Sequence, residues 1–120
     1  MSGMTQEDFM ADNYIEITSQ DFAEKVLNAP EMVVVNFSAT GSAACQILDP
    51  EFEAVCKEYQ GRVTFAKLIV NQNEELTSQW NVDGVPTLVF FKGGQEINRI
   101  KGIVMREKLR RQIEGALLAL

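Results

Sequence analysis

The chain has 120 residues, 46% of them hydrophobic and 23% charged, which is typical of one globular domain and excludes a disordered or fibrous chain. Its net charge is −6, divided into −10 over residues 1–90 and +4 over residues 91–120. An acidic body argues against nucleic-acid binding, because phosphate contacts need a positive surface. We interpret the basic end as a solvated helix face; docking of an acidic partner there is the alternative.

The start of the chain and its two cysteines bear on its location. Residues 1–8 contain no basic region and no apolar run, so the sequence predicts no signal peptide, no membrane anchor and no membrane partner. Cys45 and Cys56 are eleven residues apart in one expected helix, or about 16 Å along its axis. A disulfide needs Cα atoms within about 7 Å. We therefore expect two unpaired thiols and a cytoplasmic protein.

The first part of the chain predicts a tail, a strand, a helix and a second strand. Residues 1–13 are polar and acidic and are interpreted as a tail, followed by one domain over 14–120. Apolar and polar residues alternate over 14–18, which indicates a half-buried strand. Ser19 is then expected to cap a helix that stops before Pro30. The apolar, β-branched run at 32–37 predicts a central strand covered on both faces.

The second part of the chain predicts three helices and three strands. Pro50 is expected to kink the first of these helices. In chain order, the pattern predicts a helix at 42–59, a strand at 63–70, a helix at 74–80, strands at 88–91 and 96–101 joined by a hairpin turn at 92–95, and a helix at 105–120. The order is β-α-β-α-β-α-β-β-α. This predicts an α/β fold in which helices flank a mixed sheet on both faces.

The segment that joins the strand at 32–37 to the next helix contains the most informative residues. It resembles a Cys-x-x-Cys redox site in which Ser42 stands in the first position and Cys45 in the second. In such a pair the first thiolate attacks a disulfide and the second thiol resolves the mixed intermediate. A serine hydroxyl is un-ionised near neutral pH and forms no stable bond to sulfur. Only Cys45 therefore retains thiol chemistry at this point of the chain.

Further motifs make the chain similar to the thioredoxin family over residues 14–120. They are Phe37-x-Ala39, Pro50, Ala66-Lys67-Leu68, Gly84-Val85-Pro86-Thr87, Phe91-Lys92-Gly93-Gly94 and Gly102. The resemblance implies the thioredoxin fold, and it implies a cis peptide bond before Pro86. That proline would face the redox position across a groove that receives extended polypeptide. The implied groove consists of Gly41, Ser42, Ala43, Ala44, Gly84, Val85, Pro86 and Gly102.

Three residues that serve the redox chemistry of the family are replaced in this chain. The family's Trp-Cys-Gly-Pro-Cys is here Gly41-Ser42-Ala43-Ala44-Cys45, so the covering indole and the nucleophile are both replaced. The family's buried aspartate, which assists proton transfer, corresponds to Asn36, and an amide carries no proton at neutral pH. Lys67, which lies near that aspartate in the family, is expected to reach solvent or another acid instead. These changes indicate divergence from reductase activity.

Each cysteine and Ser42 also has a purely structural interpretation. Ser42 is suited to cap the following helix, and its alternative role is to donate a hydrogen bond to a bound partner. Cys45 is expected to be a covered, inert thiol; the alternative is a monothiol that forms mixed disulfides with a partner or with glutathione. Cys56 is interpreted as core packing. With no histidine and two distant cysteines, we expect no metal and no cofactor.

Two functions follow as hypotheses. The first is a thioredoxin-like module that binds peptide or protein clients in the groove without dithiol turnover. The second is a thiol-disulfide oxidoreductase, at most like a protein-disulfide reductase. It would act through Cys45 alone, or through a Cys-x-x-Cys pair if Ser42 stands where the natural chain has cysteine. Asn36 and Gly41 favour the first hypothesis, because a change at residue 42 alone would leave the family's aspartate and tryptophan in place.

Overall fold

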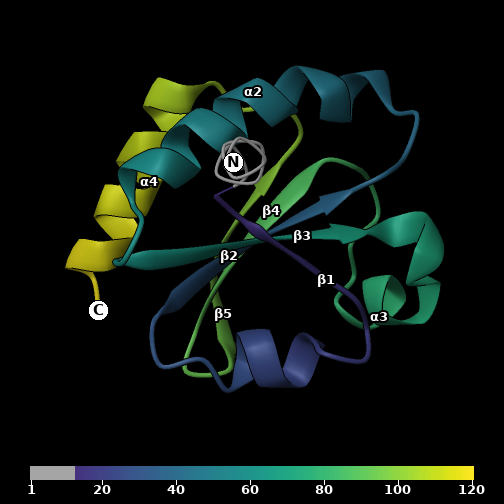
Figure 1. The fold of residues 1–120 in the computed structure, drawn as a ribbon, viewed down its shortest axis with the longest axis horizontal. Helices are drawn as coiled ribbons and strands as arrows, with labels where there is room; N and C mark the ends of the chain where they lie inside the picture. Colours follow the sequence, from purple (N-terminus) through teal and green to yellow (C-terminus); the bar gives the residue numbers. More distant parts are fainter. Residues whose placement is uncertain (1–12) are drawn as a thin grey trace, which may run out of the picture.

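A computed structural model describes residues 13–120, so the expected tail lies outside the described residues except for Asn13. Five strands form one sheet in the order β1-β3-β2-β4-β5. Figure 1 shows the ribbon, in which the elements are β1 (Ile15–Ile17), η1 (Ala23–Leu27), β2 (Met32–Ser38), α2 (Ala43–Glu58), β3 (Val63–Ile69), η2 (Val70–Gln72), α3 (Glu74–Gln79), β4 (Thr87–Lys92), β5 (Gln95–Lys101) and α4 (Arg106–Leu118). The predicted α/β fold is confirmed.

The sheet is mixed, as predicted. β2 lies at its centre, parallel to β3 and antiparallel to β4, while β1 is parallel to β3 and β5 is antiparallel to β4. Every residue of β2 is buried, which explains why its sequence is a nearly continuous apolar run, interrupted by Asn36, instead of an alternating one. The two-residue hairpin between β4 and β5 is also confirmed, and both Gly93 (φ 61°) and Gly94 (φ 79°) adopt the left-handed conformation that such turns require.

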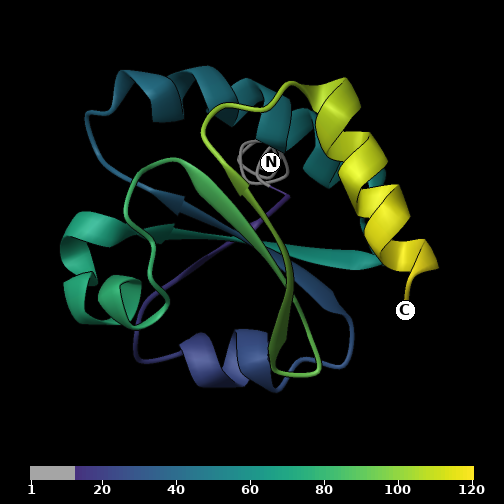
Figure 2. The same cartoon turned by 180° about the vertical axis from the view of Figure 1, so that it is seen from behind.

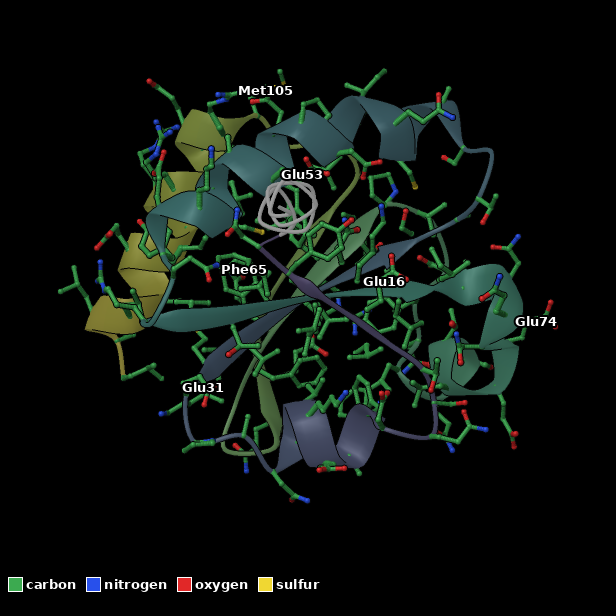
Figure 3. The ribbon with its side chains drawn as sticks, viewed as in Figure 1. Glu16, Glu31, Glu53, Phe65, Glu74 and Met105 are labelled. Carbon is green, nitrogen blue, oxygen red and sulfur yellow. The ribbon has the colours of Figure 1, made fainter. Side chains whose placement is uncertain are left out.

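Helices cover both faces of the sheet and enclose two apolar clusters. α2 and α4 lie on one face, and η1 and α3 lie on the other (Figures 1 and 2). Phe52 of α2 and Phe65 of β3 belong to the first cluster and meet edge to face, with ring centroids 5.8 Å apart. Figure 3 shows Phe65 inside the fold. Phe22, Trp80 and Phe91 pack together in the second cluster.

The prediction that Ser19 caps a helix is wrong. The backbone N–H of Ser19 donates instead to Oδ1 of Asn73, at 2.9 Å. The backbone N–H of Thr18 donates to Oδ1 of Asp21, at 2.7 Å, so residues 18–21 form a turn. Helical winding then begins only at η1, which is a single short stretch of π-helix. The N–H of Asp21, which a Ser19 cap would have bound, donates instead to the carbonyl oxygen of Thr18 at 3.2 Å.

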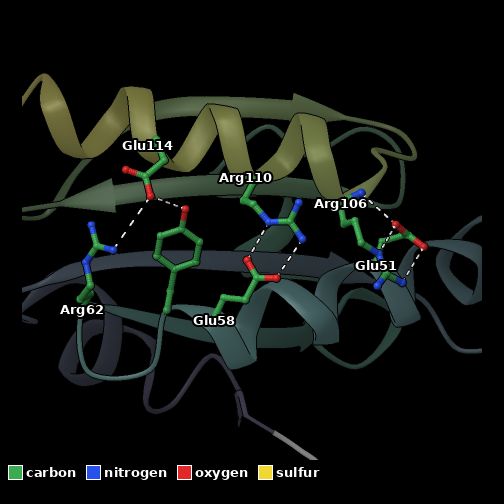
Figure 4. A network of polar contacts seen from close by, with 7 residues as sticks. Glu51, Glu58, Arg62, Arg106, Arg110 and Glu114 are labelled. Atoms are coloured by element: carbon green, nitrogen blue, oxygen red, sulfur yellow. Dashed lines mark hydrogen bonds and ion pairs between the residues drawn. The ribbon is translucent and has the colours of Figure 1, made fainter.

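A ladder of ion pairs joins α2 to α4, and Figure 4 shows it. Arg106 pairs with Glu51 at 3.0 Å, Arg110 pairs with Glu58 at 2.7 Å, and Arg62 lies 4.0 Å from Glu114, which also accepts a hydrogen bond from Tyr59. Burial and the neighbouring Glu114 carboxylate raise the pKa of Tyr59 to about 12. Because the partners follow the same order along both helices, α2 and α4 run in the same direction.

Candidate functional site

The N-terminus of α2 is built by a glycine turn and a serine cap. Gly41 adopts φ 82°, in the left-handed region where a side chain would be strained. Ser42 is extended (φ −85°, ψ 122°), and its Oγ accepts a hydrogen bond of 3.2 Å from the backbone N–H of Cys45. The expected capping role of Ser42 is therefore confirmed. This hydroxyl is engaged with the helix itself.

The Cys45 thiol points into the protein. The residue is 3% exposed, and its Sγ accepts a hydrogen bond of 3.4 Å from the backbone N–H of Ala39. Cys56, further along α2, is fully buried, and burial raises the pKa of its thiol far above the usual range. Both cysteines are free thiols. The described thiols therefore belong to the interior, which fits the structural interpretation of each.

Three segments that are distant in sequence lie at the same end of strands β2, β4 and β5. Phe37 of β2 pairs with Thr87 of β4, and Thr87 pairs with Lys101 of β5. The turn that follows β2, the segment that precedes β4 and Gly102 after β5 therefore lie together. The Val85–Pro86 peptide bond is cis, and the Pro86 carbonyl accepts a hydrogen bond of 2.8 Å from the N–H of Gly102.

The solvent exposure of these segments varies along them. The segment after β2 and the segment before β4 each contain exposed residues, whereas Pro86 is buried. The exposed residues are Gly41, Ala43 and Gly84, and the half-buried ones are Ser42, Ala44, Val85 and Gly102. The strand register places the three segments that carry these eight residues at the same end of the sheet.

Asn36 and Lys67 lie beside each other on β2 and β3, beneath α2. Asn36 is 1% exposed, and neither atom of its amide has a hydrogen-bond partner among the described residues. Lys67 is 3.2 Å from Oδ1 of Asp49 on α2, as the sequence interpretation expected when it assigned the lysine to solvent or another acid. Where the resemblance implies an aspartate beside the lysine, this chain has the neutral amide of Asn36, and Lys67 forms its ion pair with Asp49.

The comparisons with known proteins agree with this architecture. A family model for thioredoxin matches residues 13–115. The chain belongs to the thioredoxin family. Thioredoxin 2 of Chlorobaculum tepidum is 28% identical over 88% of this chain and 96% of that protein. The bifunctional thioredoxin reductase/thioredoxin of Mycobacterium leprae is 34% identical over 82% of this chain and 22% of that protein, and the chloroplastic thioredoxin X of Arabidopsis thaliana is 33% identical over 85% and 57%.

Sequence reasoning missed two sets of residues around the site of this thioredoxin-family chain. The first is a group of exposed apolar side chains: Ile47 (52% exposed), Ile103 (43%) and Met105 (55%). Glu51 accepts a hydrogen bond from the backbone N–H of Arg106, so Ile47, one turn earlier on α2, lies toward the residues that precede α4. Figure 3 shows Met105 at this outer edge. The apolar letters were visible in the sequence, but periodicity alone does not predict their exposure.

The second missed feature is an arginine that holds the segment before β4. The Arg99 guanidinium donates hydrogen bonds of 2.7 Å and 3.0 Å to the carbonyl oxygens of Trp80 and Asn81, and Glu96 holds its other side. Asn81 has φ 56°, an uncommon conformation for a residue other than glycine. Arg99 therefore fixes the loop that leads to Val85–Pro86. A lone arginine on a strand gave no sequence signal for this role.

Two further observations concern metals and membranes. Among residues 13–120, no group of three or more His, Cys, Asp or Glu side chains is placed to hold a metal ion. In the same described part of the chain, no helix is both long and apolar enough to cross a membrane.

Proposed function

We propose that this thioredoxin-family chain binds extended segments of client proteins in the groove at the N-terminus of α2, without dithiol turnover. The client lies against Gly41, Ser42 and Ala43 on one side and against Gly84, Val85 and Gly102 on the other. Backbone groups of these segments supply hydrogen bonds, and the apolar rim of Ile47, Ile103 and Met105 supplies contact area.

One observation carries this proposal. The position at which the family resemblance implies an attacking thiol holds Ser42, whose hydroxyl caps α2, and the remaining thiol of Cys45 is 3% exposed. A disulfide must approach a thiolate in line before exchange occurs, so a covered thiol reacts slowly. Asn36 beneath the helix also offers no carboxyl group for proton transfer. The site retains a surface for polypeptide and lacks an accessible nucleophile.

The names of the relatives support a second candidate, a thiol-disulfide oxidoreductase. Here the Cys45 thiolate attacks a client disulfide or oxidised glutathione, forms a mixed disulfide, and releases the other sulfur as a thiol. Burial of Cys45 counts against it. Two free thiols suit the reducing conditions of the cytoplasm, which we propose as the location for either function.

A binding experiment tests the proposal. The probe is a reduced and fully alkylated polypeptide, which is extended and contains no disulfide, added to the isotope-labelled chain and followed by amide NMR. We expect saturable shifts at Gly41, Gly84 and Gly102. Ala43→Arg introduces a bulky cation at the groove and should abolish these shifts.

The matched control is Ala23→Arg, because Ala23 is an exposed alanine of η1 on the opposite face of the sheet. It should leave binding unchanged. Equal binding by both arginine variants, or an absence of shifts in the unaltered chain, would contradict the proposed groove.

A further inference from the structure

Arg99 of β5 links the edge of the sheet to the end of α3. Its guanidinium donates hydrogen bonds of 2.7 Å and 3.0 Å to the carbonyl oxygens of Trp80 and Asn81, and on its other side it donates two hydrogen bonds of 2.8 Å to the carboxylate of Glu96. The Arg99 side chain is 18% exposed. A planar guanidinium with donors in a fixed fork suits such a two-sided arrangement, and a lysine ammonium does not. All of these contacts lie within the protein, so any effect of Arg99 on a bound partner passes through the backbone that it holds.

The two carbonyl groups that Arg99 binds lie at the C-terminus of α3, where the chain leaves the helix. α3 ends at Gln79, and the last carbonyls of a helix have no partner within it and carry the negative end of its dipole. Asn81 has φ 56°, the left-handed conformation with which a chain turns away from a helix end. A cation held on both carbonyls stabilises this turn. Arg99 thereby sets the direction in which the chain continues toward Val85 and Pro86.

The segment that follows this turn forms one wall of the proposed groove. Among the described residues, the backbone N–H groups of residues 83–85 form no hydrogen bond, so they are free to pair with the backbone of an extended client. The far end of the segment is fixed, because the Thr87 hydroxyl donates to the Gly84 carbonyl at 2.7 Å. The Gly102 N–H also donates to the Pro86 carbonyl there, at 2.8 Å. The near end depends on the turn at the end of α3.

A second cation of β5 contributes less to this wall. Lys101 lies 3.9 Å from Asp83, but the two side chains are 64% and 81% exposed. Ion pairs at such exposure contribute little. Among the described residues, Arg99 is the one side chain that forms hydrogen bonds with the backbone of residues 80–82.

We propose that Arg99 is a positioning residue for the groove: by holding the carbonyls of Trp80 and Asn81, it keeps residues 83–85 in the conformation that binds extended client segments. This inference rests on the proposed function. Where a binding conformation is populated only in part, the apparent dissociation constant rises by the inverse of that fraction. Removal of Arg99 should therefore weaken client binding and leave the fold intact, because β5 pairs with β4 through its backbone.

The test compares the full chain with Arg99→Gln and uses the reduced and alkylated polypeptide as the probe. Amide NMR should give a dissociation constant at least about tenfold higher for Arg99→Gln, while the shifts of core amides stay unchanged. Amide hydrogen exchange, measured without the polypeptide, should be faster at Val82 in the variant. The N–H of Val82 donates to the Thr77 carbonyl at 3.1 Å, so its exchange measures opening of the turn.

Three further variants separate positioning from a general loss of stability. Arg99→Lys keeps the charge without the planar fork and should restore only part of the affinity. Glu96→Gln should weaken binding less than Arg99→Gln, and it should add nothing in the Arg99→Gln background, because the two residues act as one unit. Arg110→Gln is the matched control, since Arg110 pairs with Glu58 through two nitrogens and holds no carbonyl among the described residues. It should leave the affinity and the exchange at Val82 unchanged.

Unchanged affinity in Arg99→Gln, or a loss no greater than that in Arg110→Gln, would overturn the inference and leave the groove itself in place. Faster exchange at Val82 without a change of affinity would overturn it as well. If Arg99→Gln does not fold, the same comparison is made with Arg99→Lys, and an affinity equal to that of the unaltered chain then overturns the inference. An absence of polypeptide binding by the unaltered chain would contradict the proposed function, and the inference with it.

Discussion

The two ends of helix α2 are built in different ways. Its C-terminal half is fixed against α4 by the ladder of Glu51, Glu58 and Tyr59 and by the packing of Phe52 on Phe65. Its N-terminal end is held by the hydroxyl of Ser42 and by the sulfur of Cys45, each of which makes one hydrogen bond to the backbone. The packed half of α2 is therefore held by many side chains of other elements, whereas its N-terminal end depends on two local hydrogen bonds.

The largest expected effect comes from the packed half of α2. Phe52→Ala should lower the free energy of unfolding by about 3–5 kcal/mol, because it removes a buried ring from the core and leaves a cavity. Chemical denaturation followed by circular dichroism measures it. Ile47→Ala on the same helix is the control, since Ile47 is half exposed. If both substitutions lower the free energy of unfolding by the same amount, the C-terminal half of α2 is not the more tightly packed part.

A stabilising change is expected beneath the helix. Both amide atoms of Asn36 are buried without partners, and an unsatisfied buried polar group costs about 1–3 kcal/mol. Asn36→Leu has a similar shape and should raise the free energy of unfolding by an amount in this range. Asn36→Asp should lower it at neutral pH, because it buries a charge. A loss of stability in Asn36→Leu would indicate that the amide is needed by the fold.

The site end of α2 depends on one cap. Ser42→Ala should lower the free energy of unfolding by about 1 kcal/mol, since it removes the acceptor for the N–H of Cys45. Ser78→Ala, inside α3, is the matched control and should have little effect, because Ser78 is exposed and its hydroxyl makes no hydrogen bond among the described residues. If the two variants have the same melting temperature, the Ser42 hydroxyl does not stabilise α2 as a cap.

The smallest effect is expected from the exposed ladder. Arg106 and Arg110 lower the pKa of the Glu51 and Glu58 carboxyls. A lowered folded-state pKa means that the stabilisation is present above the unfolded value of about 4.3 and is lost as the pH falls below it. The double change Arg106→Gln and Arg110→Gln should flatten this acid-side decline slightly. High salt should have the same effect on the unaltered chain, because it screens these exposed ion pairs. If salt leaves the loss of stability at acid pH unchanged, the ion pairs of Glu51 and Glu58 are not its cause.

Much of the fold could be predicted because local signals agreed with the tertiary structure. The buried run of β2, the Gly93–Gly94 turn and the Ser42 cap each carry a direct physical cause in the sequence. The turn at Ser19 could not be predicted, because Asn73, 54 residues away, takes its N–H. Arg99 was missed for a related reason: its role depends on the carbonyl oxygens of Trp80 and Asn81 that lie near it, and a single sequence does not show this.

The most direct test of the central claim is the reduction of insulin by the unaltered chain in the presence of dithiothreitol. We expect no turbidity beyond that produced by dithiothreitol alone, because Ser42 cannot attack a disulfide and Cys45 is covered. Ser42→Cys, alone and with Asn36→Asp, shows how far the fold still supports exchange. Catalysed turbidity with the unaltered chain, lost in Cys45→Ala, would instead establish a thiol-disulfide oxidoreductase that acts through Cys45.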